Sequence, residues 1–262
     1  MIYVITHKVF DDSNLEGDHY RILHVGTNDN CKDSYLRDDT GDNISEKNPN
    51  YCELTGLYWI WKNAQEADDE IDGLVHYRRH FTTDQEAFLY DYFGKKPSIL
   101  PYSVIEKDLK KYDIILPRKR KTFRKVSETY TYFHNDEDLA ILERAIDKVA
   151  LKYIADYRKV MDGHEYYFAN MMICRHELLK QYAEWLFDVL FEVEKHIDLD
   201  KYEDDYQRRV FGFMSERLLQ VWVAHKKLKV KEYSVFNTEE RGETILRKNA
   251  ERVQRIFKKH EK

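Results

Sequence analysis

The most distinctive chemistry in the sequence follows a short apolar run. The chain reads "GLVHYRRHF" (73–81), so His76, Tyr77, Arg78 and Arg79 come directly after residues typical of a buried strand. Arginine recognises phosphate and carboxylate groups through several planar donors. These residues predict an anion site at the end of a strand, in which alternation would put His76 and Arg78 on one face. The alternative is a structural cluster of ion pairs that covers the end of the sheet.

A second polar segment, "DNISEKN" (42–48), comes just before a helix-like segment. Its side chains Asp42, Asn43 and Asn48 can hydrogen-bond a ribose or another sugar. Glu53 then opens the expected helix, whose N-terminal amides favour a nearby anion. The alternative is an ordinary helix entry after a turn, and the sequence leaves both readings open.

Two isolated residues are weaker candidates for a functional site. Asn170 lies within the strand-like run "FANMM" (168–172), where the alternative is a buried amide that is satisfied by its neighbours. Glu216 lies in "GFMSERLL" (212–219), where Ser215 is expected to cap a helix and Glu216 to occupy its first turn. Because the helix dipole favours a carboxylate there, a purely structural role is the alternative for Glu216.

Composition and missing motifs exclude several classes of protein. The formal net charge of -5 argues against a general nucleic-acid binder. The chain contains no GxGxxG, Walker loop, HExxH or GxSxG motif, which weakens dehydrogenase, NTPase, zinc-protease and serine-hydrolase interpretations. Its three cysteines form no CxxC pair, which fits a reducing cytosol better than a secreted framework. We expect neither a signal peptide nor a membrane span.

Apolar periodicity predicts strands that alternate with helices. The expected strands are 1–8, 21–26, 72–81, 112–119, 166–175 and 228–236. The expected helices are 51–65, 136–150 and 176–197, and a further helix is expected within 208–227. The polar segment 28–50 is expected to form a loop. This alternation predicts an α/β fold with a mainly parallel central sheet flanked by helices. In such sheets ligands bind beyond the carboxyl ends of the strands, here Thr6-His7, His24-Gly26 and His76-Arg79.

Several segments, taken in order, resemble a known bacterial family. They are "YVITHK", "HVGTN", "GDNISEKNPNYCELTGLYWIWKN", "GLVHYRRHF", "YDIILPRKR" and "FGFMSERLL". The family was once labelled a domain of unknown function, and its members are usually described as capsular or exopolysaccharide glycosyltransferases. The resemblance runs from Ile2 to about Phe236. We therefore expect a single domain over residues 1–238 and a charged helical tail over 239–262.

The resemblance implies a GT-A-like nucleotide-sugar-binding domain. In that architecture a short strand ends in an Asp-x-Asp motif, which holds a divalent metal on the donor diphosphate. The corresponding segment here is "GLVHYRR", which has no Asp at its end. Arg78 and Arg79, with His76, can neutralise the leaving diphosphate in place of the metal. No metal ligand is assigned, and Mn or Mg remain the only cofactor candidates.

The resemblance also implies an activity and roles for individual residues. The expected enzyme is an inverting hexosyltransferase that uses a UDP-sugar, with galactofuranose as one candidate sugar, and a glycan or lipid-linked acceptor. Glu216 is the expected base, with His134 as a second choice, and Tyr166 and Asn170 would line the acceptor side. The expected donor-binding residues are Thr6, His7, Gly26, Asp42, Asn43, Ile44, Asn48, Glu53, His76, Tyr77, Arg78 and Arg79.

A second interpretation keeps the same clusters but needs no base. It is a non-catalytic nucleotide- or carbohydrate-binding protein, and turnover of a nucleotide sugar separates it from an enzyme. The expected location is the cytoplasm, with peripheral association at the inner face of the cytoplasmic membrane. No nucleic-acid partner is expected.

Overall fold

The computed structural model describes residues 1–15, 17–202 and 204–239. Within these residues, eight strands form one sheet and two short strands form another. The strands of the large sheet are β1 (Ile2–Thr6), β2 (Tyr20–His24), β3 (Leu36–Arg37), β4 (Ile71–His76), β5 (Arg79–Thr82), β6 (Ile114–Pro117), β9 (Met172–Arg175) and β10 (Val230–Asn237). The small sheet pairs β7 (Arg120–Lys121) with β8 (Glu165–Tyr166).

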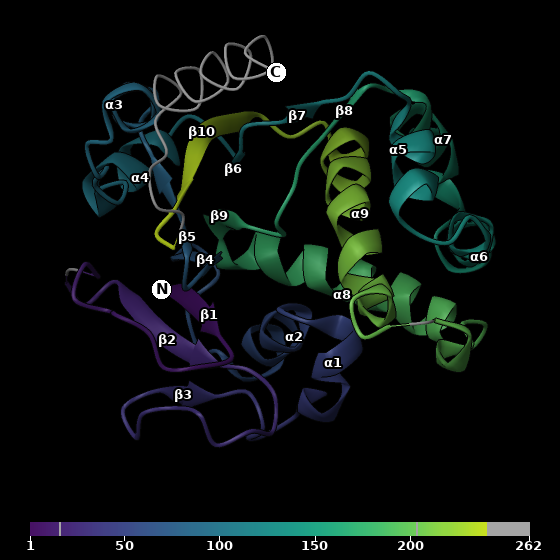
Figure 1. Cartoon of the computed structure of the whole chain (residues 1–262), viewed down its shortest axis with the longest axis horizontal. Coiled ribbons are helices and arrows are strands. Elements are labelled where there is room, and N and C mark those ends of the chain that lie inside the picture. Colours follow the sequence, from purple (N-terminus) through teal and green to yellow (C-terminus); the bar gives the residue numbers. More distant parts are fainter. Residues whose placement is uncertain (16, 203, 240–262) are drawn as a thin grey trace, which may run out of the picture.

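Helices pack around the large sheet in distinct groups (Figure 1). The α-helices are α1 (Asn48–Tyr51), α2 (Leu54–Asn63), α3 (Asp84–Phe93), α4 (Tyr102–Asp108), α5 (Val126–Phe133), α6 (Glu137–Val149), α7 (Ile154–Asp162), α8 (His176–Glu194) and α9 (Val210–Lys226). The 3₁₀ helices are η1 (Ser45–Lys47), η2 (Leu151–Tyr153), η3 (Leu199–Lys201) and η4 (Gln207–Arg209). In the view of Figure 1, α8 passes between α2 and α9, while α5, α6 and α7 form a group beyond α9.

The sheet is mixed, so the expectation of a mainly parallel sheet is wrong. Parallel pairing joins β1 to β2 and β4, β2 to β3, and β6 to β10. Antiparallel pairing joins β9 to β4 and β6, and β5 to β4 and β10. The reversal arises because the chain turns back after His76, and because β9 enters between two strands that run the other way. The α/β class itself is confirmed.

Side chains alternate between the two faces of the sheet, as the pleat requires. Tyr3 and Ile5 of β1 belong to the core that also contains α2, α8 and α9. Ile2 and Val4 belong to a second core, to which α4 contributes Ile105. Both faces are therefore covered, which explains why β1 reads as a continuous apolar run.

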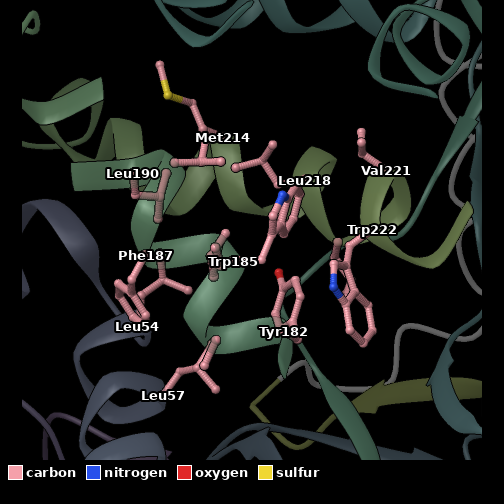
Figure 2. Packing of buried hydrophobic residues seen from close by; sticks show 14 of the residues in the cluster. Leu54, Leu57, Tyr182, Trp185, Phe187, Leu190, Met214, Leu218, Val221 and Trp222 are labelled. Atoms are coloured by element: carbon pink, nitrogen blue, oxygen red, sulfur yellow. The ribbon is translucent and has the colours of Figure 1, made fainter. Parts of the chain in front are cut away.

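The larger core lies where α8 packs between α2 and α9 (Figure 2). Leu54 and Leu57 of α2 face side chains of α8, and Trp222 of α9 packs on Tyr182 with ring centroids 5.1 Å apart. Burying a leucine of this kind contributes about 1.5–3 kcal/mol. Gly56 allows α2 to lie close to the sheet, since an added Cβ would come within 2.8 Å of Ile5 Cδ1. This packing fixes the first turn of α2, and with it Glu53.

Most predicted elements are present, but three expected segments are interrupted. The helix expected at 51–65 is divided by Cys52, whose φ of 53° ends α1 before α2 begins. The strand expected at 72–81 is the β4–β5 hairpin, and the strand expected at 166–175 is divided between β8 and β9. Ala169 (φ 72°) and Asn170 (φ 39°) adopt left-handed conformations between β8 and β9 and interrupt the strand expected at 166–175.

The segment expected as a loop contains short elements, namely β3, η1 and α1. The charged tail expected at 239–262 lies outside the described residues except for Glu239. Among the helices that the structure describes, none combines the length and the apolar character that crossing a membrane requires.

Candidate active site

A pocket of about 310 Å³ opens beyond the carboxyl ends of β1 and β4 and against the first turns of α9. It brings together residues that are far apart in the sequence. The predicted residues that line it are Thr6, His7, Asn48, Glu53, His76, Tyr77, Arg78, Arg79 and Glu216. The strand ends of β1 and β4 thus meet as expected, because these two strands are parallel neighbours.

The arginines are carried by the turn between β4 and β5. The predicted alternation of His76 and Arg78 along one strand is wrong, because the chain reverses at Tyr77 and Arg78 and His76 pairs with Arg79. Arg78 Nη1 lies 3.3 Å from a carboxylate oxygen of Glu239. Within the described part of the chain, Arg79 forms no ion pair. Burial, and then Arg78, lower the pKa of the Arg79 guanidinium, although the Glu216 and Glu53 carboxylates oppose the change.

Burial favours the neutral form of both histidines in the pocket. Burial, and then the neighbouring Arg79 and Arg78, lower the pKa of His76 to about 3. His76 Nε2 is buried and has no hydrogen-bond partner among the described residues. Burial also lowers the pKa of His7, whose ring lies edge-on to Tyr77 at a centroid distance of 5.4 Å. The positive charge of the pocket therefore resides in its arginines.

Glu53 enters the pocket just before α2 and is held from behind by Asn170. Asn170 Nδ2 donates to Glu53 Oε1 over 2.6 Å and to the Gly212 carbonyl over 3.2 Å. Asn170 adopts a left-handed conformation in a turn, so its expected place within a strand is wrong. Burial raises the pKa of the Glu53 carboxyl. Asn170 supports the pocket but does not line it.

Glu216 projects into the pocket from the interior of α9. The helix begins at Val210, so the expected first-turn position of Glu216 is wrong, and Ser215 donates to the Gly212 carbonyl within the helix and does not cap it. The Ala169 amide donates to Glu216 Oε1 over 2.9 Å, and Arg217 Nη1 donates to Oε2 over 3.1 Å. Burial raises the pKa of the Glu216 carboxyl, although Arg217 opposes the change.

Sequence reasoning missed Arg209, which also lines the pocket. Its Nε donates to Cys52 Sγ over 3.0 Å, and its guanidinium carbon lies 5.8 Å from the centre of the Phe213 ring. The pair Arg208-Arg209 just before α9 was the available signal. Other residues missed in this way are Cys52, Pro49, Gly212 and Phe213.

Several predicted donor residues lie outside the lining of the pocket. Gly26 has φ 85° and packs against Asn48, whose Oδ1 would be 2.9 Å from an added Cβ. Asp42 accepts a hydrogen bond of 3.0 Å from Tyr58, and Asn43 accepts one of 3.2 Å from the Ser45 amide. Ile44 packs against the larger core.

The two remaining predicted residues also lie outside the lining. His134 stacks on Phe213 at a centroid distance of 4.0 Å, so it lies one ring behind the pocket. Tyr166 is buried, and the Arg217 guanidinium lies 4.7 Å from its ring centre.

One trio of described residues has the ligand spacing of a metal site, but it lies elsewhere. Glu66, Asp72 and His176 bring ligand atoms within 4.8 Å of one another. Asp72 is near the start of β4, whereas the pocket lies at the end of that strand. His176 Nδ1 is bonded to Asp72 over 2.7 Å, and Tyr3 donates to Glu66 over 2.9 Å. The described pocket residues instead offer arginines and two separately held carboxylates, which is a poor ligand set for Mg or Mn.

Comparison with known protein families identifies the family of this chain. A family model described as "Domain of unknown function (DUF4422)" matches residues 1–227. The chain belongs to this family. No curated protein matches it.

A solved structure titled as the apo form of WbbM, a bifunctional glycosyltransferase, is similar to this DUF4422 chain. The TM-score is 0.77 and the sequence identity is 31%, over 91% of this chain. The match covers 45% of the WbbM chain, so this chain spans less than half of that protein's length.

Proposed function

We propose that this protein is a glycosyltransferase. The observation that carries the proposal is the pocket that Arg78, Arg79 and Arg209 line together with the half-buried carboxylate of Glu216. Such a site can bind a diphosphate and accept a proton in one place, which sugar transfer from a nucleotide donor requires. The likeness to a bifunctional glycosyltransferase supports the same activity.

The proposed reaction is a single, inverting displacement. The acceptor hydroxyl oxygen attacks the anomeric carbon of the donor sugar, and the bond from that carbon to the diphosphate oxygen breaks. The hydroxyl proton passes to the Glu216 carboxylate, and the nucleoside diphosphate leaves with the bonding electron pair. Arg79 and Arg209 offset its developing charge. Glu216 is preferred over His134 as the base because Glu216 lines the pocket and His134 does not.

The proposed donor is a UDP-hexose, with galactofuranose as one candidate sugar, in a GT-A-like domain. Thr6, His7 and Asn48 would hold the nucleoside side, and the segment that includes Asp42, Asn43 and Ile44 would support them. The proposed acceptor is a growing capsular or exopolysaccharide chain or a lipid-linked oligosaccharide.

We propose that the surface beside β7 contacts the inner face of the cytoplasmic membrane. Such a contact would bring the protein close to a lipid-linked acceptor. Phe123 is fully exposed there, at 107% of its reference area. Its exposed neighbours Arg120, Lys121 and Arg124 form no ion pair with any described residue. Apolar and basic groups together favour an anionic lipid surface.

Turnover of nucleotide sugars tests the proposal. The purified protein is incubated with a panel of UDP-, GDP- and dTDP-sugars, and release of nucleoside diphosphate is measured with and without lipid-linked acceptors. We expect release from a UDP-sugar, accelerated by acceptor. Binding of UDP-sugars without turnover in any acceptor mixture would favour the non-catalytic alternative.

A further inference from the structure

Aromatic rings continue outward from the wall of the pocket. Phe213 lines the pocket, and its ring centroid lies 5.1 Å from that of Tyr206 and 4.0 Å from that of His134. Tyr206 keeps 55% of its surface exposed. These three residues, here called the aromatic platform, extend from the pocket wall at Phe213 to the exposed ring of Tyr206.

We propose that the aromatic platform binds a sugar ring of the acceptor glycan and directs its hydroxyl toward Glu216. This inference rests on the proposed function and deepens it by locating the acceptor. An aromatic face offers a flat apolar surface of the kind that the C–H face of a pyranose covers, while the sugar hydroxyls stay at the polar edge. An exposed tyrosine held against two other rings is already oriented, so binding orders few side chains.

Hydrogen bonds fix the orientation of His134 and its tautomer. Gln207 Nε2 donates to the Phe133 carbonyl over 2.9 Å, which leaves Gln207 Oε1 as an acceptor. His134 Nδ1 lies 3.0 Å from this oxygen and must therefore carry the proton. Burial lowers the pKa of His134, which favours the neutral ring with Nε2 as an acceptor. The platform thus combines stacking surfaces with one group that can accept a sugar hydroxyl.

Arg209 marks the boundary between the platform and the donor part of the pocket. Its guanidinium carbon lies 5.9 Å from the Tyr206 ring centre and 5.8 Å from the Phe213 ring centre, while its Nε reaches Cys52 inside the pocket. Thr6 and His7 line the same pocket from the β1 end. The acceptor would therefore approach from the α9 side and the nucleoside from the β1 side, with Glu216 between them.

A purely structural role for Tyr206 gives different expectations. In that case its ring only covers Phe213 and His134. Removing the ring would then change stability and would not weaken glycan binding more than UDP binding. Tyr206→Ala removes the stacking face, whereas Tyr206→Phe keeps it. Phe93→Ala, in an exposed aromatic residue of α3, is the matched control.

The experiment measures the two substrates separately in the full chain. UDP binding is followed by calorimetry, and glycan binding by saturation-transfer NMR in the presence of UDP. The probes are methyl glycosides and disaccharides of galactose, glucose, mannose and N-acetylglucosamine. We expect Tyr206→Ala to weaken glycan binding at least 10-fold with UDP affinity unchanged, and Tyr206→Phe and Phe93→Ala to match the wild type.

Two results overturn the inference. One is equal glycan affinity in Tyr206→Ala and the wild type. The other is a wild-type protein that binds UDP but none of these glycans. A wild-type protein that fails to bind UDP contradicts the proposed function instead, so the two failures are distinguishable.

Discussion

The backbone amide of Ala169 donates a hydrogen bond of 2.9 Å to Glu216 Oε1. Ala169 and the next residue, Asn170, both have positive φ, which is unfavourable for residues other than glycine. This turn aims one amide at Glu216 and the Asn170 side chain at Glu53 over 2.6 Å. Strain of this kind persists where the surroundings hold it in place, and here it supports both carboxylates of the pocket.

Glu216→Gln tests the base. The amide oxygen can still accept from Ala169, and the side chain fills the same volume, but the NH2 group can neither accept from Arg217 nor take a proton. We expect transfer to fall by roughly 100-fold or more, which corresponds to about 2.7 kcal/mol of activation free energy. UDP affinity, measured by calorimetry, should stay near its wild-type value. The melting temperature, measured by thermal denaturation, should fall only slightly, through the lost contact with Arg217.

The pH dependence of transfer provides a second measurement for Glu216. Because burial raises the pKa of this carboxyl, the base is lost at a higher pH than an exposed glutamate would be. Wild-type activity should fall as pH drops through that raised pKa, and the residual activity of Glu216→Gln should not follow this limb. Glu177→Gln, in an exposed residue of α8, is the control. Normal turnover combined with low thermal stability in Glu216→Gln would mean that Glu216 is structural.

Arg79→Ala tests the diphosphate site. Arg79 forms no ion pair among the described residues, so its guanidinium remains available to a phosphate. We expect donor affinity or turnover to fall by roughly 10- to 1,000-fold, from the loss of charge-assisted contacts. Arg79→Lys should recover only part of the loss, since lysine lacks the planar fork.

Arg78→Ala should have a smaller effect than Arg79→Ala, because Arg78 already faces Glu239 at 3.3 Å. Arg118→Ala provides a control in an exposed arginine that pairs with Asp84. Donor kinetics equal to wild type in a folded protein that lacks both Arg78 and Arg79 would exclude the diphosphate role.

We also predict that transfer proceeds without a tightly bound divalent metal. Arginines lie where the diphosphate is proposed to bind, and the described trio with metal-ligand spacing is near the other end of β4. After exhaustive dialysis against EDTA, turnover should keep its rate. A metal-dependent glycosyltransferase is dialysed in parallel as a control, and its loss of activity shows that chelation was complete. Loss of activity that Mn or Mg restores would contradict the prediction.

Sequence reasoning found much of the pocket because parallel strands end at the same edge of a sheet. Thr6 and His76 could be brought together in this way, since β1 and β4 are recognisable as apolar runs. The reversal after His76 could not be predicted, because no glycine or proline marks a turn between His76 and Phe81. The strand interruption at Asn170 was hidden for the same reason.

The place of Arg209 in the pocket could not be predicted from local sequence for a different reason. Its hydrogen bond to Cys52 joins residues that are 157 positions apart. That contact depends on how α9 packs against α1, which no local pattern encodes. The helix start at Val210 was also obscured, because Ser215 resembles a cap but its hydroxyl is satisfied by the carbonyl of Gly212 within the helix.

The last prediction concerns stability and Glu192 of α8, which lies away from the pocket lining. Its carboxylate is almost fully buried and accepts hydrogen bonds from Lys148 (2.6 Å), Lys195 (2.9 Å) and His196 (3.0 Å). The bonds from Lys148 and Lys195 are the main reason that its pKa falls from an ordinary 4.5 to about 2. A lowered pKa means that the folded state favours the ionised carboxylate. This stabilisation is complete above pH 4.5 and is lost as pH falls toward 2.

Glu192→Gln should therefore lower the free energy of unfolding at pH 7, as measured by urea denaturation. The difference from wild type should narrow steadily between pH 4.5 and pH 2, because protonation removes the same interaction from the wild type. Glu106→Gln, in an exposed residue of α4, should differ little from wild type across this range. UDP affinity of folded Glu192→Gln should be unchanged at pH 7. A difference in stability that stays constant with pH would show that Glu192 acts through packing and not through its charge.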